Sequence, residues 1–177
     1  TVLFRSNKNW HYEKPPKRIN FKYSANTKPV FVLGKFGMPP WGKNANFISK
    51  NAQWIWDVKN ANKSAPKNNN VGISYVYNNK TNENIITTLH LIIDNQCTFK
   101  LNGVTQSGKY VGGWGNNNYP KISVVIKPGR NRFFFKCNNY NKGPGGLLVA
   151  CVQNTTKKIL FQSDHTWKYF DKKEDQI

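Results

Sequence analysis

KISVVIKPGRNRFFFKC, residues 121–137, contains two runs that favour β-strands and a turn between them. Residues 121–126 are rich in β-branched side chains, and residues 131–137 are centred on three consecutive phenylalanines, both typical of strands. In the intervening residues 127–130, proline presets its own φ and glycine tolerates a positive φ, so this segment favours a turn. We therefore predict a β-hairpin over residues 121–137.

The same pattern extends through most of the chain. Residues 97–101 alternate polar and apolar side chains and run into Asn102-Gly103, the dipeptide that best fits a tight hairpin turn, which predicts a partner strand over 104–110. No apolar stripe with a period of 3.6 residues and caps is present, so helix should be scarce. Further strands are predicted at 52–57, 71–77, 85–93, 147–152, 159–161 and 167–170. The expected fold is all-β, a jelly-roll sandwich of two sheets over residues 51–170.

Residues 1–50 differ in composition, because Pro15-Pro16, Pro29 and Pro39-Pro40 interrupt regular structure. We predict a basic, extended N-terminal arm here, and a charged, frayed tail over residues 171–177. The apolar island at residues 30–33 could add a strand to the domain's own sheet or to a neighbouring subunit, and the sequence leaves both alternatives open. The candidate partner-binding residues of the arm are Trp10, Lys17, Arg18 and Trp41.

The net charge is the most unusual bulk property. Lys and Arg number 27 against 8 Asp and Glu, a formal charge of +19, which attracts polyanions such as nucleic acid, acidic glycans or an acidic protein surface. The basic residues are dispersed, and a dispersed charge also serves solubility alone. No RNA-binding signature accompanies the charge, so nucleic-acid binding is an alternative and not the main prediction.

Residues that support catalysis are few. The acids between Lys14 and Ser163 are Asp57, Glu83 and Asp94, and the three histidines are far apart in the sequence, so we predict no enzyme, no metal and no cofactor. Cysteines 97, 137 and 151 are an odd number at wide spacing; we expect them reduced and buried, with a single Cys137–Cys151 disulfide as the alternative. No apolar run approaches the roughly 20 residues that span a bilayer.

One loop has the composition of a sugar-binding site. Aromatic faces stack on sugar rings while amides bond sugar hydroxyls, and both kinds of side chain occur near Gly112-Gly113. In the alternative interpretation, Trp114 is a structural plug and the asparagines only adopt left-handed turns. The candidate glycan-binding residues are Trp114, Asn116, Asn117 and Tyr119.

Several strings also resemble a known fold family. They include Ala52-Gln53-Trp54-Ile55-Trp56, Asp94-Asn95, Asn102-Gly103, Gly145-Gly146-Leu147-Leu148 and residues 126–131, and they look like the galactose-binding-like jelly-roll sandwich. The resemblance covers residues 51–170 and implies a fold that serves glycan binding, cell attachment and structural roles. The acidic calcium-binding loop of many such domains has no clear counterpart in this sequence.

A narrower resemblance concerns Trp54-Ile55-Trp56, residues 62–66 and Gly113-Trp114-Gly115, which look like strings in proteins of large DNA viruses. It implies a virion component, a minor capsid or vertex protein. Our main prediction is thus a non-enzymatic structural protein that assembles with other subunits through its arm and sandwich surfaces. The alternatives are a lectin-like carbohydrate-binding module and a basic nucleic-acid-binding protein; the expected location is the virion, otherwise the cell surface or a secreted form.

Overall fold

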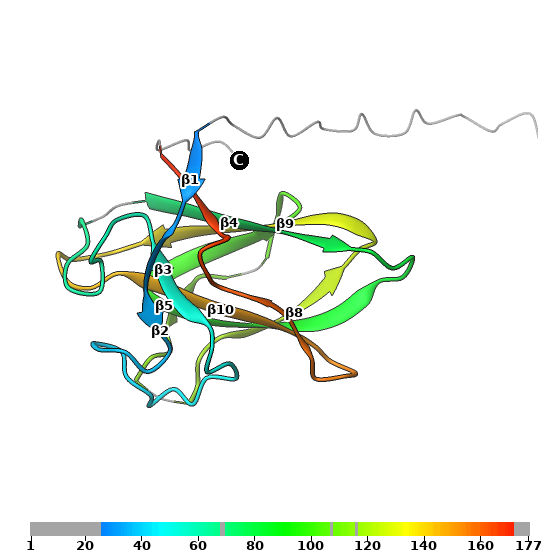
Figure 1. The fold of residues 1–177 in the computed structure, drawn as a ribbon, viewed down its shortest axis with the longest axis horizontal. Coiled ribbons are helices and arrows are strands. Elements are labelled where there is room, and N and C mark those ends of the chain that lie inside the picture. Colours follow the sequence, from blue (N-terminus) through cyan, green and yellow to red (C-terminus); the bar gives the residue numbers. More distant parts are fainter. Residues whose placement is uncertain (1–25, 68–69, 107, 116, 172–177) are drawn as a thin grey trace, which may run out of the picture.

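The structure, a computed structural model, describes residues 26–67, 70–106, 108–115 and 117–171. Within these ranges the chain forms strands and no helix, so the prediction of an all-β fold is confirmed (Figure 1). No membrane-spanning helix occurs in this part of the chain. The strands are β1 (Thr27–Pro29), β2 (Phe31–Lys35), β3 (Gln53–Trp56), β4 (Asn70–Asn79), β5 (Ile85–Leu101), β6 (Val104–Thr105), β7 (Tyr110–Gly112), β8 (Lys121–Ile126), β9 (Gly129–Asn138), β10 (Gly146–Gln153), β11 (Ile159–Gln162) and β12 (Lys168–Phe170).

Strand β5 belongs to two sheets. Residues 85–94 pair with β8 and β10, whereas residues 96–101 pair with β9, and the chain passes from one sheet to the other at Asp94-Asn95. The first sheet, here the β10 sheet, contains β8, the first part of β5, β10, β11, β3 and β2. The second, here the β9 sheet, contains β1, β12, β4, β9 and the second part of β5, with β6 and β7 beside β5.

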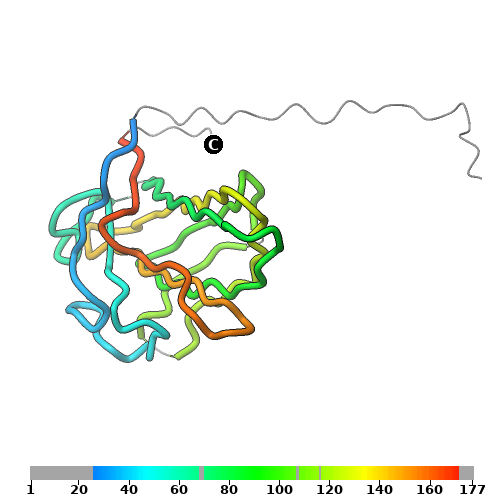
Figure 2. Tube along the Cα trace, turned by 45° about the vertical axis from the view of Figure 1, so that its right-hand side comes forward, coloured from blue at the N-terminus to red at the C-terminus, as the bar shows by residue number. Residues whose placement is uncertain are grey.

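Residues 27–35 join the two sheets at the edge of the sandwich opposite β5. β1 pairs with β12 in the β9 sheet, and β2, one residue later, pairs with β3 in the β10 sheet. Between them Val30 is buried, and its N–H donates to the carbonyl of Trp167 at 3.1 Å. Figure 2 shows β1 and β12, from opposite ends of the sequence, side by side. The apolar island of the predicted arm therefore adds its strand to the domain's own sheet.

The main core lies between the two sheets. Alternate residues of each strand point inward, as expected for a sandwich, so Phe133 and Phe135 of β9 are buried while Phe134 between them is half-buried on the outer face. Phe99 of β5 stacks on Phe135 with ring centroids 4.9 Å apart, and Trp167, just before β12, packs on the same ring.

A second apolar cluster covers part of the outer face of the β10 sheet, around Trp54, Ile92 and Leu148. The segment between β2 and β3, residues 36–52, folds across this face and buries Trp41, whose ring lies 3.9 Å from that of Trp54. A Cβ on Gly146 would lie 2.7 Å from Trp41, so β10 needs glycine where the two tryptophans pass. Residues 36–50, predicted as part of an extended arm, are thus packed on the domain.

The hairpin predicted over residues 121–137 is wrong. β8 pairs with the first part of β5 in the β10 sheet, whereas β9 pairs with β4 and the second part of β5 in the β9 sheet. The Pro-Gly turn therefore makes an arch that crosses the sandwich, and the buried side chain of Asn131 holds it through bonds to Lys127 and Gly129. The hairpin turn at Asn102-Gly103 is confirmed: both residues have positive φ, and Leu101 lies opposite Val104. The partner strand predicted over 104–110 is shorter, since β6 covers only Val104–Thr105.

The three cysteines are free and buried, as predicted. The alternative Cys137–Cys151 disulfide is wrong, because the register places Cys137 of β9 opposite Cys97 of β5, while Cys151 lies opposite Leu89 in the other sheet. Both facing thiols lie in the inter-sheet core.

Candidate functional site

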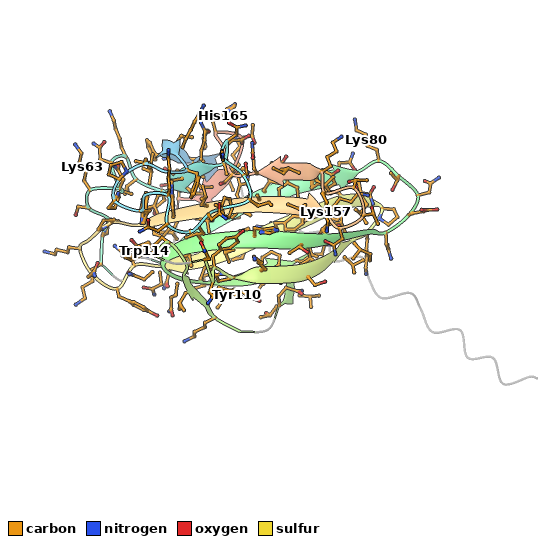
Figure 3. The ribbon with its side chains drawn as sticks, turned by 90° about the horizontal axis from the view of Figure 1, so that it is seen from below. Lys63, Lys80, Tyr110, Trp114, Lys157 and His165 are labelled. Carbon is orange, nitrogen blue, oxygen red and sulfur yellow. The ribbon has the colours of Figure 1, made fainter. Side chains whose placement is uncertain are left out.

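Loops from both sheets meet at the end of the sandwich where β5 crosses. β3 and β9 end there and β4 and β10 begin there, since Asn70 lies opposite Asn138 and Gly146 opposite Asp94. We call this the crossing end; its loops are residues 57–67, 113–120 and 139–145. Figure 3 shows Lys63 and Trp114 at this end and Lys80 and Lys157 at the other.

The crossing itself is fixed by two side chains. The buried carboxylate of Asp94 accepts a hydrogen bond from the Trp41 indole at 2.9 Å and another from the Asn95 amide at 2.7 Å. Burial raises the pKa of Asp94, and the indole donor opposes that rise. Asn95 also accepts the backbone N–H of Tyr140 at 2.8 Å. These groups therefore position the loops around the crossing.

The loop at 113–120 is anchored at its base. Gly113 has a φ of +95°, and a Cβ there would lie 2.7 Å from the Cβ of Tyr119, so the two ends of the loop approach too closely for any other residue. Tyr119 is buried, with its ring 5.3 Å from that of Phe47 and its hydroxyl 3.0 Å from Nδ1 of His90. On this fixed base the Trp114 side chain is 41% exposed.

The other two loops are joined to each other. The buried Asn139 amide donates to the carbonyls of Ala65, Asn141 and Gly143 at 2.7 to 3.2 Å. The backbone N–H of Ala65 donates to the same Gly143 carbonyl at 2.9 Å. This joined pair of loops carries the exposed side chains of Tyr140, Lys63 and Lys142.

The structure separates the residues that the sequence grouped as a glycan site. Trp114 and Asn117 are exposed at the crossing end, whereas Tyr119 supports the loop from below and lies off its surface. Asn116 lies outside the described residues. Sequence reasoning missed Tyr140, although its setting, Asn-Asn-Tyr-Asn-Lys before a Gly-Pro, resembles that of Trp114 and could have identified it.

The predicted arm residues lie in two places. Trp10, Lys17 and Arg18 fall outside the described residues. Trp41 is 3% exposed and packs between Trp54 and Asp94, so its ring is occupied by its own domain and is not presented to a partner.

Burial inside the domain shifts the pKa values of one histidine and two cysteines. Burial, with Lys121 nearby, lowers the pKa of His90 to about 4, and burial raises the pKa of Cys151 to about 12. Burial beside Cys97 raises the pKa of Cys137 well above its usual value. In the described part of the chain, no three His, Cys, Asp or Glu side chains gather closely enough to hold a metal ion.

Comparisons with known proteins identify solved structures with a similar fold. The chain is similar to the Pleurotus ostreatus lectin in its apo form, at 18% identity and a TM-score of 0.56, over 82% of this chain and 39% of that one. For the Pleurotus ostreatus lectin in complex with GalNAc, identity and TM-score are the same, with 40% of that chain covered. The α-L-rhamnosidase of Streptomyces avermitilis, complexed with L-rhamnose, matches at 18% identity and a TM-score of 0.54, over 85% of this chain and 14% of that one.

The fold is an antiparallel β-sandwich of the kind seen in these lectin and rhamnosidase structures. The chain spans about two fifths of the lectin and a smaller share of the rhamnosidase. No protein-family model and no curated protein sequence matches it.

Proposed function

We propose that this chain is a carbohydrate-binding module whose glycan site is the crossing end. The observation behind the proposal is Trp114, a large aromatic ring exposed on a loop whose base is pinned by Gly113 and Tyr119. A loop whose base is fixed before binding loses less conformational entropy when a ligand stacks on its exposed ring.

The surrounding groups suit a sugar. The indole face can stack on the apolar face of a pyranose, and amides such as Asn117 can bond its hydroxyls. Tyr140 offers a second exposed ring on the other side of the crossing. Val111 of β7 and Asn138 of β9 both lie opposite Gln96 of β5, so these two strands are about 10 Å apart. That spacing suits an oligosaccharide that contacts both loops.

The comparisons support this alternative over our main sequence-based prediction. Both lectin structures share the fold, and one holds GalNAc. Neither the fold nor the comparisons favour a virion component, which stays a prediction, as does the absence of enzymatic activity.

A glycan panel that includes GalNAc- and galactose-terminated oligosaccharides tests the proposal, with affinities then measured by calorimetry. We expect Trp114→Ala to weaken binding at least about 10-fold and Tyr140→Ala to weaken it less, as for the loss of aromatic contacts. Ile86→Ala, an exposed apolar residue of β5 remote from the crossing, is the matched control and should bind normally. Absence of binding across the panel, or equal losses in Trp114→Ala and Ile86→Ala, would contradict the proposal.

A further inference from the structure

The charged side chains on the outer face of the β9 sheet are all basic. Its outward-pointing side chains alternate with the buried residues of the core, and none of the residues of β1, β4, β6, β9, β12 or the second part of β5 is acidic. An ordinary solvated sheet face mixes both signs of charge, which favours solubility without a strong local field. The outward cations are Lys100, Arg130, Arg132, Lys136 and Lys168.

The register arranges these cations in a cross centred on Phe134. Across the sheet, Lys168 lies opposite Ser74, Ser74 opposite Phe134, and Phe134 opposite Lys100, so the two lysines are three strand spacings, about 14 Å, apart. Along β9, positions 130, 132, 134 and 136 point to the same side at intervals of about 6.8 Å.

Aromatic rings orient the central cation. The Arg132 guanidinium lies 5.6 Å from the Phe134 ring and 5.3 Å from the Phe170 ring, and the two rings meet edge to face at 5.6 Å. Gly72 leaves room for them, since a Cβ there would lie 3.1 Å from each ring. This cluster holds one guanidinium in place at the centre of the face.

None of the described acids, Asp57, Glu83, Asp94, Asp164 and Asp171, belongs to a strand of the β9 sheet. Asp94 is buried at the crossing, and Asp171, just beyond β12, pairs with Lys28 at 2.9 Å. Glu83 lies in the loop between β4 and β5, at the far end from the crossing. The field of the whole chain, at +19, adds to the local one.

We propose that the outer face of the β9 sheet binds a linear acidic polysaccharide through its sulfate or carboxylate groups. The spaced cations match repeating anions along such a chain, and the partly exposed Thr98 of β5 stands among them as a partner for sugar hydroxyls. Single-stranded nucleic acid fits less well, because bases need open aromatic faces and Arg132 already lies over both rings. This surface is separate from the crossing end, and the inference does not rest on the proposed glycan site.

The test compares two triple variants of the full chain with equal net charge. The face variant is Lys100→Gln, Lys136→Gln and Lys168→Gln; the control is Lys80→Gln, Lys127→Gln and Lys158→Gln, exposed lysines away from this face. The probes are a heparin oligosaccharide, a neutral dextran and a single-stranded DNA, each titrated over a range of salt concentrations. We expect the face variant to bind heparin at least about 10-fold more weakly, with a shallower salt dependence, and the control to stay within about twofold of the parent protein.

Three results would overturn the proposal: no heparin binding by the parent protein, equal losses in both triple variants, or tighter and face-dependent binding of the DNA. Circular dichroism checks that each variant is folded. If the face variant does not fold, Lys168→Gln alone, at an exposed position on β12, must still weaken heparin binding more than Lys158→Gln does. Trp114→Ala should leave heparin binding unchanged, which separates this surface from the crossing end.

Discussion

Trp41 and Trp114 show how differently one residue type is used in this chain. Trp41 is buried against Trp54 and bonded to Asp94, whereas Trp114 is exposed on a loop. In the sequence both stand beside glycines, and nothing local distinguishes them. What separates them is the fold of residues 36–52 over the β10 sheet, a long-range contact that no local pattern encodes.

Trp41→Ala should lower the free energy of unfolding by about 3 to 5 kcal/mol, because it leaves a cavity beside Trp54 and removes a hydrogen bond from the buried Asp94. Trp114→Ala should lower it by less than about 1 kcal/mol, since that ring is exposed. Chemical denaturation of both variants checks this. Equal losses would show that residues 36–52 do not pack as described.

His90 should make stability depend on pH. Its pKa is lowered to about 4 by burial and by Lys121, and the hydroxyl of Tyr119 lies 3.0 Å from its Nδ1. A histidine with a pKa below its unfolded value of about 6.5 stabilises the fold fully above that pH, and this contribution is lost as the pH falls towards 4, by up to about 3 kcal/mol. Asp94, whose pKa burial raises, contributes a slope of opposite sign.

The contribution of His90 to the pH dependence of stability is therefore measured as the difference between the parent protein and a His90 variant. Between pH 7 and pH 4, the free energy of unfolding of the parent protein should fall relative to that of His90→Gln, which cannot titrate. Denaturant midpoints at half-unit pH steps measure both proteins. A constant difference over this range would mean that His90 takes a proton as readily in the folded state as in the unfolded chain.

At the scale of elements, strand positions were predictable and strand partners were not. Alternation and β-branching located β3, β4, β8, β9 and β10, because these signals are local. The Pro-Gly segment at 127–130 gave a correct turn but a wrong hairpin, since a turn residue fixes the backbone direction and does not say which sheet the next strand joins. Asn102-Gly103 succeeded because its two-residue turn leaves the chain no other partner.

The same limit applies to the candidate site. Composition located the Trp114 loop, but the tie from Asn95 to Tyr140 joins residues 45 positions apart in the sequence. The sequence makes Tyr119 a candidate glycan-binding residue, whereas its burial depends on Phe47 and His90 from distant segments.

The arch between β8 and β9 depends on Asn131. Its buried side chain bonds the backbone N–H and carbonyl of Lys127 and the carbonyl of Gly129. Asn131→Ala should therefore cost about 2 to 4 kcal/mol of unfolding free energy, because these groups lose their partners. Asn82→Ala, an exposed asparagine in the β4–β5 loop, is the control and should change stability by less than about 0.5 kcal/mol. Thermal unfolding of the two variants measures both changes. A loss of unfolding free energy in Asn131→Ala no larger than in the control would contradict this role of Asn131.

At the scale of the whole molecule, the two proposed surfaces suit different ligands: neutral glycans at the crossing end and acidic polysaccharides on the β9 sheet. The crossing end presents rings and amides from joined loops, and the β9 sheet presents cations at regular spacing. Residues 36–52 cover the part of the β10 sheet's outer face around Trp54, Ile92 and Leu148, whereas Ile86 and Val125 are exposed. The β9 sheet therefore offers a ligand a face that residues 36–52 do not cover.

The passage of β5 through both sheets also governs how the molecule comes apart. Neither layer can lose this strand without breaking the backbone bonds of the other, so the sandwich should open as a single cooperative unit. Native-state hydrogen exchange should then give the β5 amides on either side of Asp94-Asn95 the same opening free energy, to within about 1 kcal/mol. If the amides of residues 97–101 exchanged through a far cheaper opening than those of residues 89–93, the layers would be separable, and a ligand on one could leave the other undisturbed.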